Sequence, residues 1–111
     1  MNCIFLCLHW YAVVRIGEFE CFDSLGVTEA VLRSRLPRPM QKSCTFNENR
    51  LQPSLSKLCG PFSILFVTAR FLNSDLSFSQ VLSEYFSQSD VENEKIVTEF
   101  WASGGYLVGE L

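Results

Sequence analysis

Apolar and polar positions near the start of the chain follow the patterns of β-strands. Residues 4–14 are apolar except for His9, which predicts a buried strand. Residues 10–16 are rich in aromatic and β-branched side chains, and after a glycine-containing turn residues 19–23 alternate again. We therefore predict that residues 10–16 and 19–23 pair as a β-hairpin.

A polar stretch separates this hairpin from the main helical part of the chain. Residues 28–36 suit a short helix that Thr28 caps and Pro37 stops. Residues 37–50 are polar, contain prolines and lack any periodicity. They are predicted to form a loop, with a short strand around residues 44–46.

The strongest helical pattern begins at Cys59. Proline is tolerated only in the first turn of a helix, so Pro61 places the helix N-terminus at residues 59–61. The apolar residues that follow at helical spacing are Phe62, Ile64, Leu65, Phe66, Val67, Ala69, Phe71 and Leu72. Because this helix is apolar nearly all round, we expect it to be buried at the centre of the fold.

Two more helices are predicted in the last third of the chain. Ser77 and Gln80 have the spacing of a capping box ahead of residues 81–86, and Asp90 is expected to cap residues 91–101. The aromatic residues of the three helices are expected to form the core: Phe62, Phe66, Phe71, Phe78, Tyr85, Phe86, Phe100 and Trp101.

Composition fits one packed domain over residues 1–111, since 48% of the residues are apolar and 19% are charged. The net charge of −3 excludes a simple basic nucleic-acid binder. However, residues 1–70 hold eight bases against five acids, while residues 71–111 hold one base against seven acids. An anionic partner is therefore expected to prefer the first part of the chain.

The five cysteines do not have the spacing of a metal site. The chain has no CxxC pair and a single histidine, so no metal and no cofactor are predicted. The carboxylates of the last helix are spread around it and are expected to be solvated. Because the cysteine count is odd, free thiols in a reducing compartment are expected, in the nucleus or the cytoplasm.

Residues 4–14 also imitate a secretory signal, which is an alternative to the buried strand. The segment lacks a basic n-region and a small-residue cleavage site, and it is too short to span a bilayer. No membrane association is therefore expected. A small secreted or membrane-inserted protein is the least favoured interpretation.

A few residues together suggest nucleophilic catalysis. A helix N-terminus favours the thiolate form of a cysteine, so Cys59 is a candidate nucleophile. His9 is the only histidine and would be its base, with Asp23 at the end of the paired strand orienting the imidazole. Gln52 could donate a side-chain N–H to an oxyanion. Taken singly, a lone histidine or a cysteine in a buried helix is more often structural.

At these positions the sequence resembles a known family. The motifs are His9-Trp10 opening a strand, residues 22–26 (FDSLG) ending the next, and Leu51-Gln52 seven residues before Cys59-Gly60. They look like those of the adenovirus-type (adenain-like) cysteine endopeptidases, especially the copies in Maverick/Polinton mobile elements. More distantly they are similar to the ubiquitin-like-protein proteases.

The resemblance implies an α+β fold of the papain-like or ubiquitin-like-protein-protease type, in which a β-hairpin packs on a central helix with further helices C-terminal. It implies that Cys59 attacks a peptide carbonyl, His9 is base and then acid, Asp23 orients His9, and Gln52 lines the oxyanion hole. The implied substrates are structural-protein precursors of a virus-like element, often cleaved after Gly-X-Gly-type sequences. DNA or an activating peptide is a further partner in viral members.

Family members have several dozen residues ahead of the histidine, whereas eight precede His9 here. An N-terminally truncated copy is therefore expected. The alternative to an active peptidase is a decayed remnant that keeps the fold and at most binds a protein partner.

Overall fold

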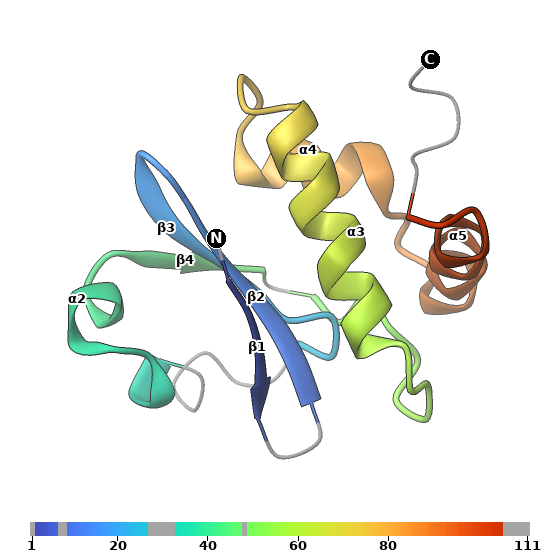
Figure 1. Ribbon diagram of the computed structural model, residues 1–111, viewed down its shortest axis with the longest axis horizontal. Helices are drawn as coiled ribbons and strands as arrows, with labels where there is room; N and C mark the ends of the chain where they lie inside the picture. Colours follow the sequence, from blue (N-terminus) through green and yellow to red (C-terminus); the bar gives the residue numbers. More distant parts are fainter. Residues whose placement is uncertain (1, 7–8, 27–32, 48, 106–111) are drawn as a thin grey trace.

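The sheet has four strands in the order β1-β2-β3-β4 (Figure 1). The computed structural model describes residues 2–6, 9–26, 33–47 and 49–105, with the backbone alone for residues 2–6 and 9. The strands are β1 (Asn2–Leu6), β2 (His9–Ile16), β3 (Glu18–Phe22) and β4 (Cys44–Phe46). The first three are antiparallel neighbours, and β4 runs parallel to β3.

The predicted hairpin is confirmed by β2 and β3. Ala12 pairs with Phe22 and Ile16 with Glu18, and Gly17 makes the reversal with a φ of 77°, which favours glycine. The single strand predicted over residues 4–14 is wrong, because the chain reverses between β1 and β2 and the two strands pair. A continuous apolar run does not mark the point at which a chain turns back on itself.

The stretch before β4 contains more helix than predicted. Residues 33–35 are helical, while the rest of the helix predicted over residues 28–36 lies mostly outside the described residues. A short helix, α2 (Arg38–Gln41), stands where a loop was predicted. It begins directly after Pro37 and carries Pro39 in its first turn, where a missing N–H costs nothing. The strand predicted at residues 44–46 is confirmed.

Three helices form the other half of the molecule: α3 (Cys59–Leu72), α4 (Phe78–Tyr85) and α5 (Asp90–Ala102). Figure 1 shows α3 running beside the sheet, with α5 on its far side and α4 crossing behind the end of α3. The architecture is therefore α+β, with a central helix between a sheet and two further helices. None of the helices in the described part of the chain is long and apolar enough to cross a membrane.

The helix ends confirm one predicted cap and correct another. Ser77 and Gln80 form the capping box of α4, with each side chain bonded to the backbone N–H of the other residue. Ser89, not Asp90, caps α5, because its side chain accepts from the N–H of Glu92 and its backbone is extended. Asp90 is the first helical residue.

The inner core fills the space between the sheet and the three helices. Phe22 of the sheet stacks on Phe66 of α3, with ring centroids 4.6 Å apart. The buried members of the inner core are Ala12, Val14, Phe22, Leu51, Phe62, Leu65, Phe66, Phe78, Phe86, Val97 and Phe100. Phe71 and Trp101 are 52% and 51% exposed, so the prediction that they are core residues is wrong. The sheet and two helices do not surround α3 completely.

The outer core lies on the opposite face of the sheet, under residues 33–46. Its buried members are Tyr11, Val13, Cys21, Leu36 and Cys44. The three cysteines whose side chains are described, Cys21, Cys44 and Cys59, are free thiols. A hydrogen bond with Cys44, followed by burial, raises the pKa of the Cys21 thiol above 9.0.

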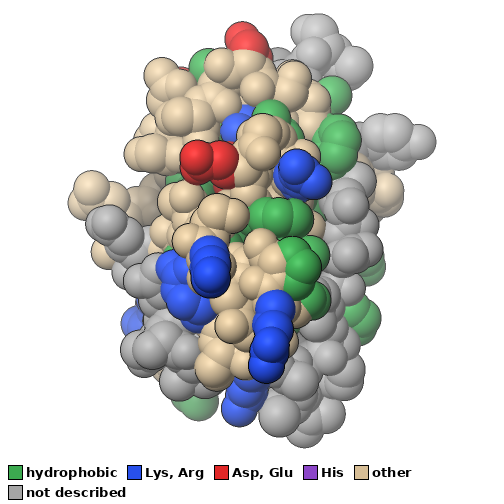
Figure 2. Space-filling model, turned by 90° about the vertical axis from the view of Figure 1, so that its left-hand side faces the viewer, with side chains coloured by type: hydrophobic (Ala, Val, Ile, Leu, Met, Phe, Trp, Pro, Cys, Tyr) green, Lys and Arg blue, Asp and Glu red, His purple; other side chains and the backbone are tan. Residues whose placement is uncertain are grey.

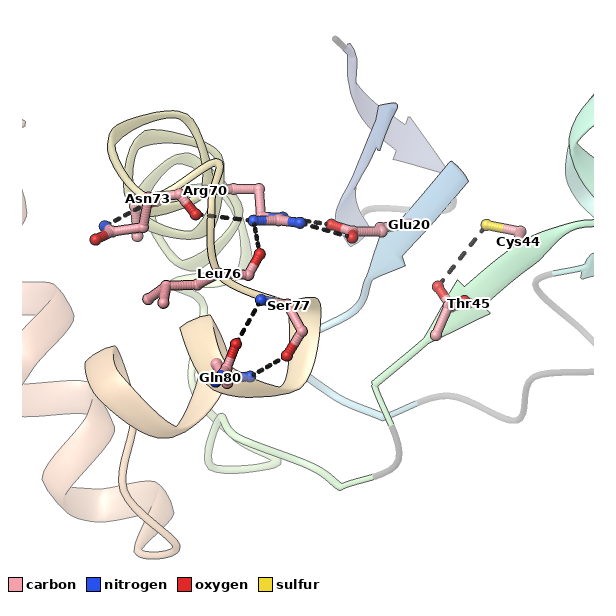
Figure 3. A network of polar contacts seen from close by, with 9 residues as sticks. Glu20, Cys44, Thr45, Arg70, Asn73, Leu76, Ser77 and Gln80 are labelled. Carbon is pink, nitrogen blue, oxygen red and sulfur yellow. Dashed lines mark hydrogen bonds and ion pairs between the residues drawn. The ribbon is translucent and has the colours of Figure 1, made fainter. Parts of the chain in front are cut away.

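A buried ion pair ties α3 to the sheet (Figure 3). Arg70 donates two hydrogen bonds to the Glu20 carboxylate, at 2.7 and 3.0 Å, and its remaining nitrogen donates to the carbonyls of Asn73 and Leu76. The guanidinium therefore joins β3, the end of α3 and the loop before α4. Because both charges are buried and paired with each other, removing either partner alone would leave the other charge buried without its counterpart.

Candidate functional site

Cys59 is the first residue of α3, as its sequence context predicts. Leu58 precedes it with a non-helical backbone, and no side chain caps the helix. The backbone N–H of Trp10 points at the Cys59 sulfur, with a nitrogen–sulfur distance of 3.4 Å. The sulfur therefore lies at the N-terminal end of α3 and beside an N–H donor.

Trp10 covers the start of α3. A Cβ atom placed on Gly60 would meet Cδ1 of the Trp10 indole at 3.5 Å, which is ordinary contact distance. Trp10 is 38% exposed, whereas Cys59 is 8% exposed. The partly exposed indole therefore packs beside the nearly buried thiol. A side chain larger than a methyl group at Gly60 would displace the indole.

His9 is the first residue of β2, directly before Trp10. The backbone of the predicted base therefore reaches the strand end that contacts Cys59. The His9 side chain lies outside the described residues, so its predicted role stays a prediction.

Asp23 follows β3 directly and is 1% exposed. The β2–β3 pairing ends with Ala12 opposite Phe22, so Asp23 stands directly beyond the end of the paired strands. Burial is the main cause that raises the pKa of Tyr11 above 10.0; Cys21 and the Asp23 carboxylate act in the same direction, and Arg35 opposes them. The Asp23 carboxylate therefore lies near Tyr11 of β2.

Asn47 holds the backbone of Asp23 from both sides. The Asn47 amide accepts from the Asp23 N–H at 2.8 Å and donates to the Asp23 carbonyl at 2.8 Å. The Asp23 carboxylate accepts from the N–H of Leu25 at 3.1 Å, and Gly26 closes the turn with a φ of 63°. A Cβ atom on Gly26 would lie only 3.0 Å from the backbone nitrogen of Arg50, so the turn requires glycine at this position.

Gln52 is fully buried and bonded to the residue that follows Asp23. The Ser24 carbonyl accepts the N–H groups of Leu51 and Gln52, at 2.8 and 2.9 Å. The Ser24 hydroxyl donates to Oε1 of Gln52, and Nε2 of Gln52 donates to the Ser56 carbonyl at 2.8 Å. The Ser56 hydroxyl in turn accepts from the N–H of Leu58, just before α3.

Hydrogen bonds thus link Ser24, the residue after Asp23, to Gln52, and Gln52 through Ser56 to Leu58, the residue before Cys59. Sequence reasoning did not assign a role to Ser24. The only signal was its place in the FDSLG motif at residues 22–26.

A basic surface lies on the sheet side, away from Cys59. Residues 33–42 carry Arg33, Arg35, Arg38 and Lys42 and no acid, and Figure 2 shows Lys and Arg side chains gathered on this face. Arg33 is engaged by the Gln41 and Cys44 carbonyls and by the Phe46 ring. The other three are exposed, which agrees with the charge excess of the first part of the chain.

A groove lies elsewhere on the described part of the chain. It measures about 1500 Å³ and runs between residues 45–47 and 49–51 and α4, reaching Asp90 at the start of α5. Its lining includes none of Asp23, Gln52 and Cys59. Within the described residues, no group of three or more His, Cys, Asp or Glu side chains could hold a metal ion.

Comparisons with protein-family models, with curated proteins and with solved structures found no match for this chain.

Proposed function

We propose that the chain is a cysteine-type endopeptidase with Cys59 as its nucleophile. One observation supports this proposal most directly. The N-terminus of α3 contacts the end of β2 that begins with His9 and Trp10, and the Cys59 sulfur lies 3.4 Å from the backbone nitrogen of Trp10. The resemblance in residues 9–10, 22–26 and 51–60 supports the same assignment.

In the proposed reaction the Cys59 sulfur attacks the carbonyl carbon of a peptide bond. His9 takes the thiol proton and then gives it to the leaving amine, while Asp23 orients the imidazole. The carbonyl oxygen becomes an oxyanion between the Cys59 backbone N–H and the Gln52 amide. Water, deprotonated by His9, then releases the acid product and restores the thiol.

By resemblance, the substrates are structural-protein precursors of a virus-like mobile element, cleaved after Gly-X-Gly-type sequences. The partly exposed Trp10 beside Gly60 supports a narrow approach to the thiol, where small residues fit best. The exposed basic side chains of residues 33–42 would be the place for an anionic activator such as DNA.

The test compares thiol reactivity with peptide cleavage. Limiting iodoacetamide, read by mass spectrometry, is expected to label Cys59 faster than the other four cysteines, because in the proposed site His9 would activate its thiol as a base. Cys59→Ala is expected to abolish cleavage of Gly-X-Gly-containing peptides. Cys44→Ala is the matched control, since Cys44 is 6% exposed and lies away from the site.

Equal labelling of all five thiols would contradict the proposal. A chain that unfolds cooperatively yet turns over no peptide would support the alternative, a decayed peptidase that keeps the fold and binds a protein partner. Cleavage that persists in Cys59→Ala would exclude Cys59 as the nucleophile.

A further inference from the structure

We propose that Ser24 is a positioning residue for the oxyanion hole, because its hydroxyl fixes the direction of the Gln52 amide. This inference rests on the proposed function and assigns a role to a residue outside the predicted catalytic set. The contacts of Gln52 carry it.

The orientation of the Gln52 amide follows from the chemistry of its two partners. The Ser56 carbonyl can only accept a hydrogen bond, so the amide must present its NH₂ group to that oxygen, at 2.8 Å. Oε1 then faces Ser24, whose hydroxyl donates to it. A flipped amide would place two acceptors against each other at Ser56, so the Ser24 bond holds the only orientation that satisfies both ends.

One hydrogen of the Gln52 NH₂ group has no acceptor among the described residues. Gln52 is 0% exposed, its Oε1 is bonded to Ser24, and its other Nε2 hydrogen is bonded to Ser56. A buried donor without a partner destabilises the fold, and such groups need a reason. An oxyanion that forms only during the reaction supplies one, because it would accept this hydrogen in the transition state.

Ser24 also links the Gln52 amide to the segment that contains Asp23. Ser24 directly follows Asp23, whose backbone Asn47 holds at both ends, and the Ser24 carbonyl accepts two N–H groups from residues 51–52. Any shift of Ser24 would therefore move Gln52. A displacement of about 1 Å of such a donor is enough to lower the rate of the catalysed reaction about a hundredfold.

The test measures kcat, KM and Cys59 alkylation in Ser24→Ala. Without the Ser24 hydroxyl, Oε1 of Gln52 loses its hydrogen-bond donor and the amide is no longer held in one orientation. We therefore expect kcat to fall about 10- to 100-fold with KM nearly unchanged. The rate of Cys59 alkylation by iodoacetamide is expected to stay within about twofold, because alkylation forms no oxyanion. Adding Ser24→Ala to Gln52→Ala is expected to cause no further loss.

Ser63→Ala is the matched control. Ser63 is also 0% exposed, and its hydroxyl donates to the Cys59 carbonyl within α3, so it reports the loss of a buried hydroxyl alone. Its kcat is expected to stay within about threefold of the wild type. If Ser24→Ala fails to fold, Ser24→Thr and Ser24→Val replace it, since they match in shape and only Thr keeps the hydroxyl.

Equal kcat values for Ser24→Thr and Ser24→Val, or for Ser24→Ala and Ser63→Ala, would overturn the positioning role while leaving the peptidase intact. A parallel fall of kcat and alkylation would show that Ser24 acts on the fold or on Cys59, and would also overturn it. A wild-type chain without peptide turnover would overturn the proposed function, and this role with it.

Discussion

The two faces of the sheet differ in how they are covered. The inner core holds six phenylalanines from three helices and β3, whereas the outer core is a small cluster of Tyr11, Val13, Leu36 and two thiols under residues 33–46. Alternation along β2 sends Ala12 and Val14 to the inner face and Tyr11 and Val13 to the outer face. One face is therefore held by a large aromatic layer, and the other by short segments of chain.

The candidate site lies where these two unequal layers meet. Cys59 begins the helix that covers the inner face, while Asp23 follows the outer-face residue Cys21 in the alternation of β3. The site is thus built on a firmly packed helix and on a strand end whose outer cover is thin. Mutations in the two layers should consequently have different costs.

Phe66→Ala is expected to give the largest effect. Phe66 is 0% exposed and stacks on Phe22, so its removal leaves a cavity in the inner core and costs about 4 kcal/mol. Urea denaturation followed by circular dichroism measures this change. Phe71→Ala on the same helix is the control, because a half-exposed ring should cost less than about 1 kcal/mol. Similar losses in both variants would contradict the inner-core assignment.

Arg70→Met is expected to cost somewhat less, about 3 kcal/mol, because it leaves the Glu20 carboxylate buried without its partner. Combining it with Glu20→Leu removes the stranded charge and is expected to restore most of the free energy of unfolding. A double-mutant cycle in urea tests this. Additive losses would mean that the two side chains do not act as a pair.

Leu36→Ala in the outer core is expected to cost about 2 kcal/mol, at the low end for a buried leucine, because a thin layer collapses readily into the space. Hydrogen exchange should show faster exchange in β4 while α3 stays protected. Equal loosening of both elements would erase the difference between the two faces.

Alkaline pH should weaken the outer core by the smallest amount. The pKa of Cys21 is raised above 9.0 in the folded chain, so the unfolded chain loses this proton first. This contribution to stability is therefore fully present well below pH 9 and is lost as the pH rises through 9 toward the raised pKa of the folded state. Urea midpoints from pH 7 to pH 10 measure this. Cys21→Ala should remove most of the slope, and an unchanged slope would assign it to another group.

The sequence predicted those elements whose signals are local. The glycine turn between residues 16 and 18, the helix that starts at Cys59 and the Ser77–Gln80 capping box each depend on neighbours within a few residues. The cap of α5 was misassigned by one residue because Ser89 and Asp90 are both good capping types, and only the backbone conformation separates them.

Patterns also suggested His9, Asp23, Gln52 and Cys59 as a site, but not how they are joined. The hydrogen bonds between Asn47 and the Asp23 backbone join residues 24 positions apart, and the hydrogen bond between Ser24 and Gln52 joins residues 28 positions apart. No periodicity encodes such pairs, because they depend on where β4 and the loop after it settle against β3.

The sequence by itself predicted the β2–β3 hairpin, β4, the three long helices, the position of Cys59 at a helix N-terminus and the candidate chemistry. Tertiary structure alone decided that β1 folds back on β2, that β4 joins β3 in parallel, and that Glu20 meets Arg70 across 50 residues. The reason is that hydrophobic spacing and capping act within one or two turns of chain. Strand pairing and buried polar contacts depend on packing between distant segments. There each buried donor or acceptor forms its hydrogen bond with whichever group the tertiary fold places next to it.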